Sequence, residues 1–208
     1  MSYDIELVNK VTGETAKMKH PQYVRGGTVP ARVNPVTKEL EQAEQVEAHI
    51  NITYNYSHYY YEATDGDIRF AHDEVSAYYA DGTQGPFETK YGIRGLYGTT
   101  PAESIPMLMD MIEKIKAKYT DENGEWIDTE RTKTVYYKNG KEIKERNVLD
   151  AILNHDYDRK EEVTYSVNEG DISSYYMATA ANAIMALKQM MVMATDNLTE
   201  KNIVWDGD

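Results

Sequence analysis

The segment from residue 46 to residue 56 alternates between apolar and polar side chains, the period of a β-strand with one buried face. The apolar side carries Val46, Ala48, Ile50, Ile52, Tyr54 and Tyr56. The polar side carries Glu47, His49, Asn51, Thr53 and Asn55. The pattern predicts a Tyr-rich strand that packs one face against a hydrophobic core.

A second alternating pattern opens the chain, where Tyr3, Ile5 and Leu7 share one face. Turn-forming residues at 9–14 allow residues 15–18 to return as the second strand of an N-terminal hairpin. Residues 203–205 are typical of a short closing strand. These segments predict an antiparallel sheet built from the N-terminal hairpin and the Tyr-rich strand.

Two helices are expected to cover this sheet. Thr100 and Glu103 form a capping-box motif with Pro101 between them, so a helix should begin there and reach about residue 118. Residues 179–195 carry an apolar stripe at helical spacing and predict a largely buried second helix. A short helix is also expected around residues 71–79. The sequence therefore predicts the α+β class, with a sheet against two main helices.

Residues 119–170 have the composition of a polar insertion. Asn139-Gly140 lies between two strand-like runs, 132–137 and 141–146, and predicts an inserted β-hairpin with a tight turn. A short helix at 147–154 and a strand at 163–167 follow. We expect a single domain over residues 1–208, with insertion-like segments at 29–45, 62–90 and 119–170.

Composition restricts the classes of function. The 208 residues include 35 acidic and 22 basic side chains, giving a formal charge of -13, and no cysteine. Such a charge disfavours general binding to nucleic acid or anionic lipid, and the absence of cysteine excludes disulfides and thiol catalysis. No apolar run is long enough to span a membrane, and the first residues lack the features of a signal peptide. We therefore expect a cytoplasmic protein.

No catalytic motif emerges from the sequence, and we expect neither an enzyme nor a cofactor. Gly92, Gly95 and Gly98 precede a helix, but their spacing is not that of a nucleotide-binding loop, and Glu103 occupies the helix N-terminus. The five histidines are not spaced as ligands on one helix face, so no metal site is expected.

Polar residues on otherwise apolar elements form the candidate ligand site. Asn55 lies in the Tyr-rich strand, Arg94 lies among glycines, and Asn182 lies on the last helix. One interpretation is a structural network in which these groups satisfy buried backbone atoms. The other is a small polar pocket bounded by Tyr54 and Tyr56.

Tyrosine is unusually frequent, with 18 residues against 2 phenylalanines and 2 tryptophans. Tyrosine is enriched at protein interfaces, but it also suits a sheet face whose hydroxyl groups reach water. The candidate protein interface comprises Tyr59, Tyr60, Tyr61, Tyr78 and Tyr79.

Short segments spread along the whole chain carry a family resemblance: MSYDIEL at 1–7 with RGGT at 25–28, NITYNYS at 51–57, GIRGLYG at 92–98 with ESIP at 103–106, YYMATAANA at 175–183, and VWDGD at 204–208. In these segments the chain resembles a family of small bacteriophage and prophage proteins of unsettled activity. Tyr176 stands where the family usually has Trp, and Ala181 where it has Gly. The resemblance implies a compact core decorated by insertions and a phage origin, and it supplies no catalytic residues.

These observations favour a non-enzymatic phage protein that binds a host bacterial protein, one with a basic surface, and antagonises antiphage defence. One alternative is a sponge that sequesters a small nucleotide signal by stacking on tyrosine. Another is an acidic DNA mimic, although lysine-rich stretches interrupt its acids. Self-association is compatible with all three functions.

Overall fold

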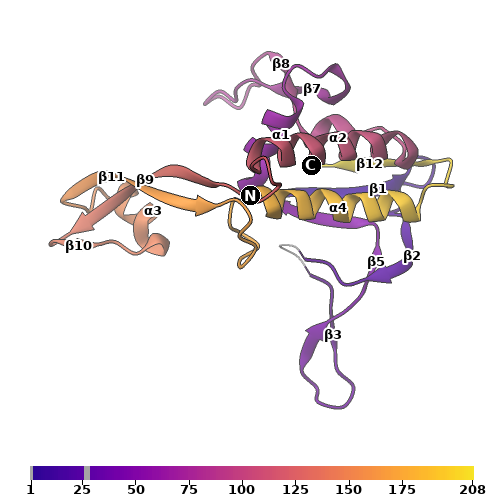
Figure 1. Cartoon of the computed structure of the whole chain (residues 1–208), viewed down its shortest axis with the longest axis horizontal. Helices are drawn as coiled ribbons and strands as arrows, with labels where there is room; N and C mark the ends of the chain where they lie inside the picture. Colours follow the sequence, from indigo (N-terminus) through magenta and orange to yellow (C-terminus); the bar gives the residue numbers. More distant parts are fainter. Residues whose placement is uncertain (1, 26–28) are drawn as a thin grey trace.

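A computed structural model describes residues 2–25 and 29–208. Met1 and residues 26–28, which belong to the first stretch of the phage-family resemblance, lie outside the described residues. The α+β class is confirmed, with three-stranded and two-stranded antiparallel sheets and four α-helices in the described part of the chain. Figure 1 shows helices lying along a central sheet, with three hairpins projecting away from it.

The central sheet has the order β12-β1-β6, from β1 (Ser2–Asn9), β6 (His49–Thr53) and β12 (Ile203–Gly207). Leu7 pairs with Trp205 on one side of β1, and Ile5 pairs with Ile50 on the other. Tyr3, Ile5 and Leu7 are buried while Asp4 is exposed, as the alternation predicts. The sheet therefore buries one face and turns a polar face to solvent.

The expected N-terminal hairpin forms only in part. The chain reverses at residues 10–13, and the returning segment makes one isolated bridge, between Val8 and Thr15. The next strand, β2 (Lys17–Gln22), then pairs with β5 (Gln45–Glu47) instead of continuing along β1. Strand β1 is occupied on both sides by β12 and β6, so no edge remains for a longer hairpin.

The Tyr-rich strand is shorter than the alternation predicts. Strand β6 ends at Thr53, whose side chain caps a 3-10 helix, η1 (Tyr54–Tyr56), by accepting a hydrogen bond from the Asn55 amide. Helix α1 (Ser57–Thr64) follows directly. Tyr54 and Tyr56 are thus in a helical turn, because a local side-chain cap competes with continued strand pairing.

Two long helices cover the buried face of the sheet. They are α2 (Pro101–Tyr119) and α4 (Ala180–Asp196), which pack against each other and against strands β12 and β6 respectively. The predicted capping box of Thr100 and Glu103 begins α2. Helix α4 buries residues around most of its circumference, so the core lies between these helices and the sheet.

Both edges of the central sheet are covered. At the β6 edge, the Tyr175 hydroxyl donates to the Asn51 carbonyl (2.6 Å) and accepts from the Thr53 amide (3.0 Å). At the β12 edge, the Trp205 amide donates to the Thr99 carbonyl (3.0 Å), and the Gly98 amide donates to the Trp205 carbonyl (2.8 Å). These contacts satisfy backbone groups that an edge strand would otherwise expose.

The three projections overlap the segments expected to form insertions, but the start of the segment 62–90 belongs to the core, since Ala63, Thr64 and Phe70 are buried. The first is a hairpin of β3 (Ala31–Val33) and β4 (Leu40–Gln42). The second, which we name the aromatic hairpin, is residues 71–91, with β7 (Ala71–Val75) and β8 (Phe87–Tyr91); it follows a short 3-10 helix, η2 (Ile68–Phe70). The expected helix at 71–79 is therefore wrong, because the segment finds its hydrogen-bond partners in β8.

The third projection, which we name the arm, is residues 128–168. It comprises β9 (Asp128–Lys138), β10 (Lys141–Glu142), α3 (Glu145–Leu153) and β11 (Arg159–Asn168). The tight turn at Asn139-Gly140 is confirmed, since both residues have positive φ, 51° and 71°. The main partner of β9 is nevertheless β11, with a ten-residue ladder, and α3 lies in the connection.

Candidate functional site at the root of the aromatic hairpin

Arg94 lies on a short 3-10 helix, η3 (Ile93–Leu96), between two glycines. Gly92 has a φ of 151°, which a side chain rarely adopts. A Cβ atom on Gly95 would lie 2.3 Å from the Phe70 Cα atom. These glycines therefore let η3 pass directly against η2, which places Arg94 beneath the aromatic hairpin.

Three hydrogen bonds occupy the guanidinium of Arg94. Its Nη1 donates to Glu74 Oε1 (2.6 Å), its Nη2 to the Tyr54 hydroxyl (3.0 Å), and its Nε to the Asp208 carbonyl (3.1 Å). Arg94 thus ties strand β7 to helix η1 and to the last residue of the chain. We name Arg94 and its three partners the root network. It fixes the position at which the aromatic hairpin leaves the core.

The charges of the root network compensate one another. Burial on its own would raise the pKa of Glu74, but the hydrogen bonds from Arg94 and His72 outweigh it, so this pKa lies below its ordinary value. The pKa of Arg94 is raised, because its interactions with Glu74 and Tyr54 outweigh the burial that would lower it. The pair is ionised at neutral pH and leaves no uncompensated positive charge on Arg94.

A cleft of about 500 Å³ opens beside this network, between the end of α1 and the aromatic hairpin. Its lining is polar and aromatic: Tyr61, Asp65, Glu74, Thr89, Lys90 and Tyr91. Lys90 forms an ion pair with Glu88 (2.7 Å). Tyr61, an expected interface residue, is 42% exposed at this position.

The outer part of the aromatic hairpin exposes large aromatic side chains. Tyr78 is 72% exposed, Tyr79 53% and Phe87 64%. Residues 71–91 contain four acidic side chains and one basic one, a net formal charge of -3. Tyr78 and Tyr79 therefore lie at the surface, as expected of interface residues, and Phe87 is a neighbour that sequence reasoning missed.

Asn55, Tyr56 and Asn182 lie away from this site and hold the loop at 174–177. Asn55 Nδ2 donates to the Tyr176 carbonyl (2.7 Å), and the Tyr56 hydroxyl donates to the Tyr175 carbonyl. Asn182 Nδ2 donates to the carbonyls of residues 174 and 177, each at 2.9 Å. The five predicted ligand residues therefore do not line one pocket. These contacts agree with the interpretation that the polar groups satisfy backbone atoms, and not with the interpretation that they line a small polar pocket.

Tyr59 and Tyr60 cannot form an interface in the folded chain, because both are fully buried. They lie on the inner face of α1, whereas the sequence pattern places them at the surface. The Tyr60 hydroxyl donates to the Ala183 carbonyl (3.2 Å), and the Tyr59 hydroxyl donates to Glu169 Oε2 (2.5 Å). Both side chains link α1 to the rest of the core.

Glu169 forms a buried polar cluster that joins the arm to the core. Its carboxylate accepts hydrogen bonds from Arg131 Nη2 (2.7 Å), Thr129 Oγ1 (2.5 Å) and the Ala180 amide (2.8 Å), besides Tyr59. Burial would raise the pKa of Glu169, but these donors outweigh it, and the pKa is lowered. No sequence signal distinguishes Glu169 from the other acids of its segment.

In the described residues, no group of three or more His, Cys, Asp and Glu is arranged to hold a metal ion. Over the same part of the chain, no helix is both long and apolar enough to cross a membrane. No family model, curated protein or solved structure matches the chain.

Proposed function

We propose that this chain is a non-enzymatic bacteriophage protein that binds a protein of the infected bacterium in its cytoplasm and antagonises host defence. The aromatic hairpin is the contact surface. The observation that carries this proposal is the exposure of Tyr78, Tyr79 and Phe87 on one acidic projection. The phage origin and the host target rest on the family resemblance of the sequence.

The exposed side chains are of the type that dominates binding energy at interfaces. Aromatic anchors bury a large apolar area while losing few rotamers, and Tyr is enriched among hot-spot residues. Tyr also keeps a hydroxyl group for a hydrogen bond at the rim. Three such groups on one hairpin are enough to form the centre of a small interface.

The charge of the hairpin favours a partner with a basic surface. Its net formal charge of -3 is part of the -13 of the whole chain, and the remaining residues carry -10, so both near and distant charges attract such a partner. Complementary charge accelerates association and excludes acidic partners. Binding should therefore be faster at low ionic strength.

The root network supports the proposal because it orients the hairpin before binding. Arg94 bonds to Glu74 on β7 of the hairpin and to Tyr54 on η1, which belongs to the body of the protein. A preorganised surface loses less conformational entropy on association than a mobile one. Arg94 is thus a positioning residue in this proposal.

The nucleotide-sponge alternative receives less support. Phosphate recognition needs a guanidinium with a free charge and free donors, whereas three of the five N–H groups of Arg94 bond to Glu74, Tyr54 and Asp208, and the Glu74 carboxylate pairs with its charge. The DNA-mimic alternative shares a basic partner with our proposal, but it requires acidic side chains, not aromatic ones, to dominate the binding energy.

Pull-down from lysate of an infected or infectable bacterium tests the proposal with two matched triple variants. One replaces Tyr78, Tyr79 and Phe87 with Ser. The control replaces the exposed apolar residues of the β3–β4 hairpin with Ser: Val33, Val36 and Leu40.

We expect one host protein to bind the wild type and the control but not the aromatic variant. Retention of the same protein by the aromatic variant contradicts the assignment of the surface. A variant without two acidic side chains of the hairpin, Asp81→Asn with Glu88→Gln, should bind more slowly but still bind. Complete loss in that variant alone would favour DNA mimicry.

A further inference from the structure

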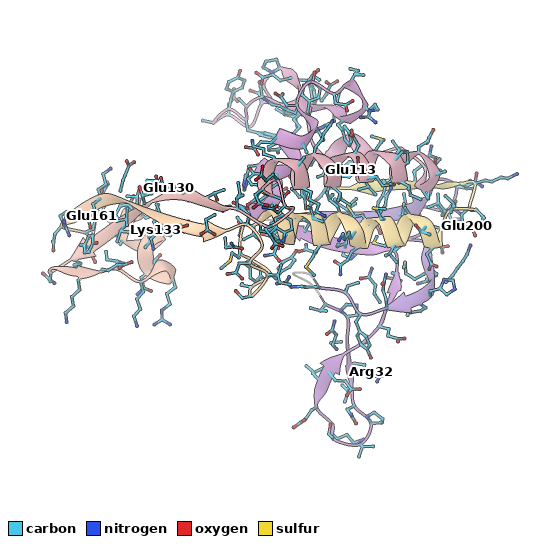
Figure 2. The ribbon with its side chains drawn as sticks, viewed as in Figure 1. Arg32, Glu113, Glu130, Lys133, Glu161 and Glu200 are labelled. Atoms are coloured by element: carbon cyan, nitrogen blue, oxygen red, sulfur yellow. The ribbon has the colours of Figure 1, made fainter. Side chains whose placement is uncertain are left out.

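The arm extends from the core as a two-stranded ribbon with a helix near its tip (Figures 1 and 2). In the described chain β11 pairs with β9 alone, and β10 covers only two residues of the other side of β9. Two-stranded ribbons are marginally stable in water unless a further element covers them. The stability of the arm therefore depends on what its tip buries.

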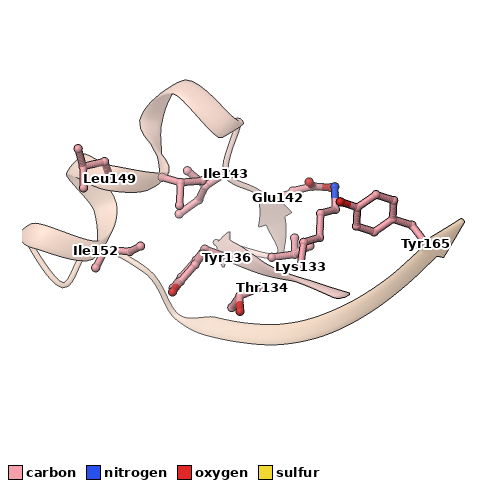
Figure 3. A pocket seen from close by; sticks show the side chains of 10 residues that line it. Lys133, Thr134, Tyr136, Glu142, Ile143, Leu149, Ile152 and Tyr165 are labelled. Atoms are coloured by element: carbon pink, nitrogen blue, oxygen red, sulfur yellow. The ribbon is translucent and has the colours of Figure 1, made fainter. Parts of the chain in front are cut away.

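Helix α3 covers the ribbon only in part. Val135 of β9 and Ala151 of α3 are buried between them, but Leu149 is 66% exposed and Leu153 68%. A groove of about 600 Å³ runs between α3 and the ribbon (Figure 3). Its apolar lining comprises Val135, Tyr136, Ile143, Val148, Leu149 and Ile152. Each copy thus presents both an apolar groove and protruding apolar side chains.

Two stretches of the arm carry opposite net charge and lie side by side in it, where Lys138 of one forms an ion pair with Asp156 of the other. Residues 133–146 contain five basic and two acidic side chains, a net charge of +3. Residues 150–162 contain two basic and five acidic side chains, a net charge of -3. A surface that pairs with its own copy about a twofold axis must be self-complementary, and neighbouring stretches with net charges of equal size and opposite sign meet that condition.

The rest of the molecule repels a second copy. Residues 128–168 contain eight basic and nine acidic side chains, so the arm carries -1 and the remaining residues carry -12. Contact between two bodies brings large like charges together, whereas contact between two arm tips does not. The central sheet is also closed to an added strand, because Tyr175 and the Gly98–Thr99 backbone cover its edges.

We infer that the arm tip is an interface for a second copy of this chain, formed by two arms about a twofold axis. The Leu153 side chain of each copy lies in the groove of the other. The basic stretch of one arm faces the acidic stretch of its partner. This interface is separate from the aromatic hairpin, so a dimer presents two hairpins to the proposed host target.

Sedimentation of the full chain over a range of concentrations tests the inference. We expect a reversible monomer–dimer equilibrium for the wild type. Leu153→Asp should weaken dimerisation roughly a hundredfold, since burying a Leu is worth about a factor of ten and the twofold axis counts the change twice. Val36→Asp, at an exposed position of the β3–β4 hairpin, should leave it unchanged.

Two outcomes would overturn the inference: a wild-type chain that stays monomeric at millimolar concentration, or a dimer that Leu153→Asp does not weaken. Because Leu153 is exposed in the monomer, its replacement should not unfold the chain, and circular dichroism of both variants checks this.

Cysteine cross-linking supplies an independent readout, since the natural chain has no cysteine. Leu153→Cys should give a covalent dimer with a short bismaleimide, and Val36→Cys should not. Equal cross-linking of the two variants contradicts the assignment of the arm tip. Host-protein capture by the aromatic hairpin is measured separately, so failure of dimerisation leaves that proposal standing, and the reverse also holds.

Discussion

Replacing Arg131 with Met should destabilise the folded chain by about 2–3 kcal/mol, a large part of the stability of a typical domain. The substitution keeps an apolar side chain of similar length but removes the cation that faces Glu169. That carboxylate is fully buried, and its bond to Arg131 Nη2 is 2.7 Å long.

The magnitude follows from the contacts that remain. Removing one partner of a buried ion pair generally costs about 3–5 kcal/mol, because a desolvated charge is left behind. Here the Arg131 side chain is 22% exposed, and Tyr59, Thr129 and Ala180 still donate to the carboxylate. Because these donors remain and water reaches part of the Arg131 site, the expected loss of stability lies at or below the lower end of that range.

Urea unfolding followed by circular dichroism measures the effect in a double-mutant cycle of Arg131→Met and Glu169→Gln. The double variant should lose less stability than the sum of the two single variants, because the residues interact directly. Arg32→Met is the control, since Arg32 pairs with Glu41 at the surface, where solvent screens the interaction and such pairs contribute little to stability. Equal losses for Arg131→Met and Arg32→Met, or strict additivity in the cycle, would refute the reasoning.

Two further predictions concern a close approach and an acid titration. Gly95→Ala should cost about 2–3 kcal/mol, because its Cβ would lie 2.3 Å from the Phe70 backbone. Thermal unfolding should show a smaller loss for Gly85→Ala, whose nearest contacts are 3.1 Å, and equal losses in the two variants would contradict the argument. Hydrogen bonds from Arg69 lower the pKa of Asp67 to about 2. The resulting stabilisation is fully present above the unfolded pKa of 3.8 and is lost as the pH falls through about 2. Asp67→Asn should therefore flatten the dependence of the unfolding free energy on pH between these values, and an unchanged slope in urea titrations argues against this role.

Elements with local signals were predictable from the sequence. Thr100 and Glu103 specify the start of α2 through contacts three residues apart. The Asn139-Gly140 turn depends on two residues that tolerate positive φ. In both cases the deciding interactions lie within a few residues of each other.

Elements defined by distant partners were not predictable in the same way. Strand β1 pairs with β12, almost two hundred residues later, so its neighbours depend on the whole fold. The expected helix at 71–79 is a strand because β8 is available to pair with it. The alternation through Tyr56 suggested a longer strand, but the Thr53 cap redirects the chain.

The candidate site was predictable only in its parts. Arg94, Tyr54, Tyr61, Tyr78 and Tyr79 could be selected by residue type, and they lie on or near the aromatic hairpin. Their partners depend on the tertiary fold: Glu74 is an ordinary acid in sequence, and only the passage of η3 beneath β7 brings it to Arg94. Burial of Tyr59 and Tyr60 likewise depends on which face of α1 turns inward.

The covered margins of the central sheet have a consequence for how this protein can be altered. Tyr175 on one side and the Thr99 backbone on the other prevent the sheet from being widened by a swapped or foreign strand. Additional sequence can be accommodated only where the chain already leaves the core. The hairpin tips, including the turn around Val36, are therefore suitable positions for grafting foreign peptides.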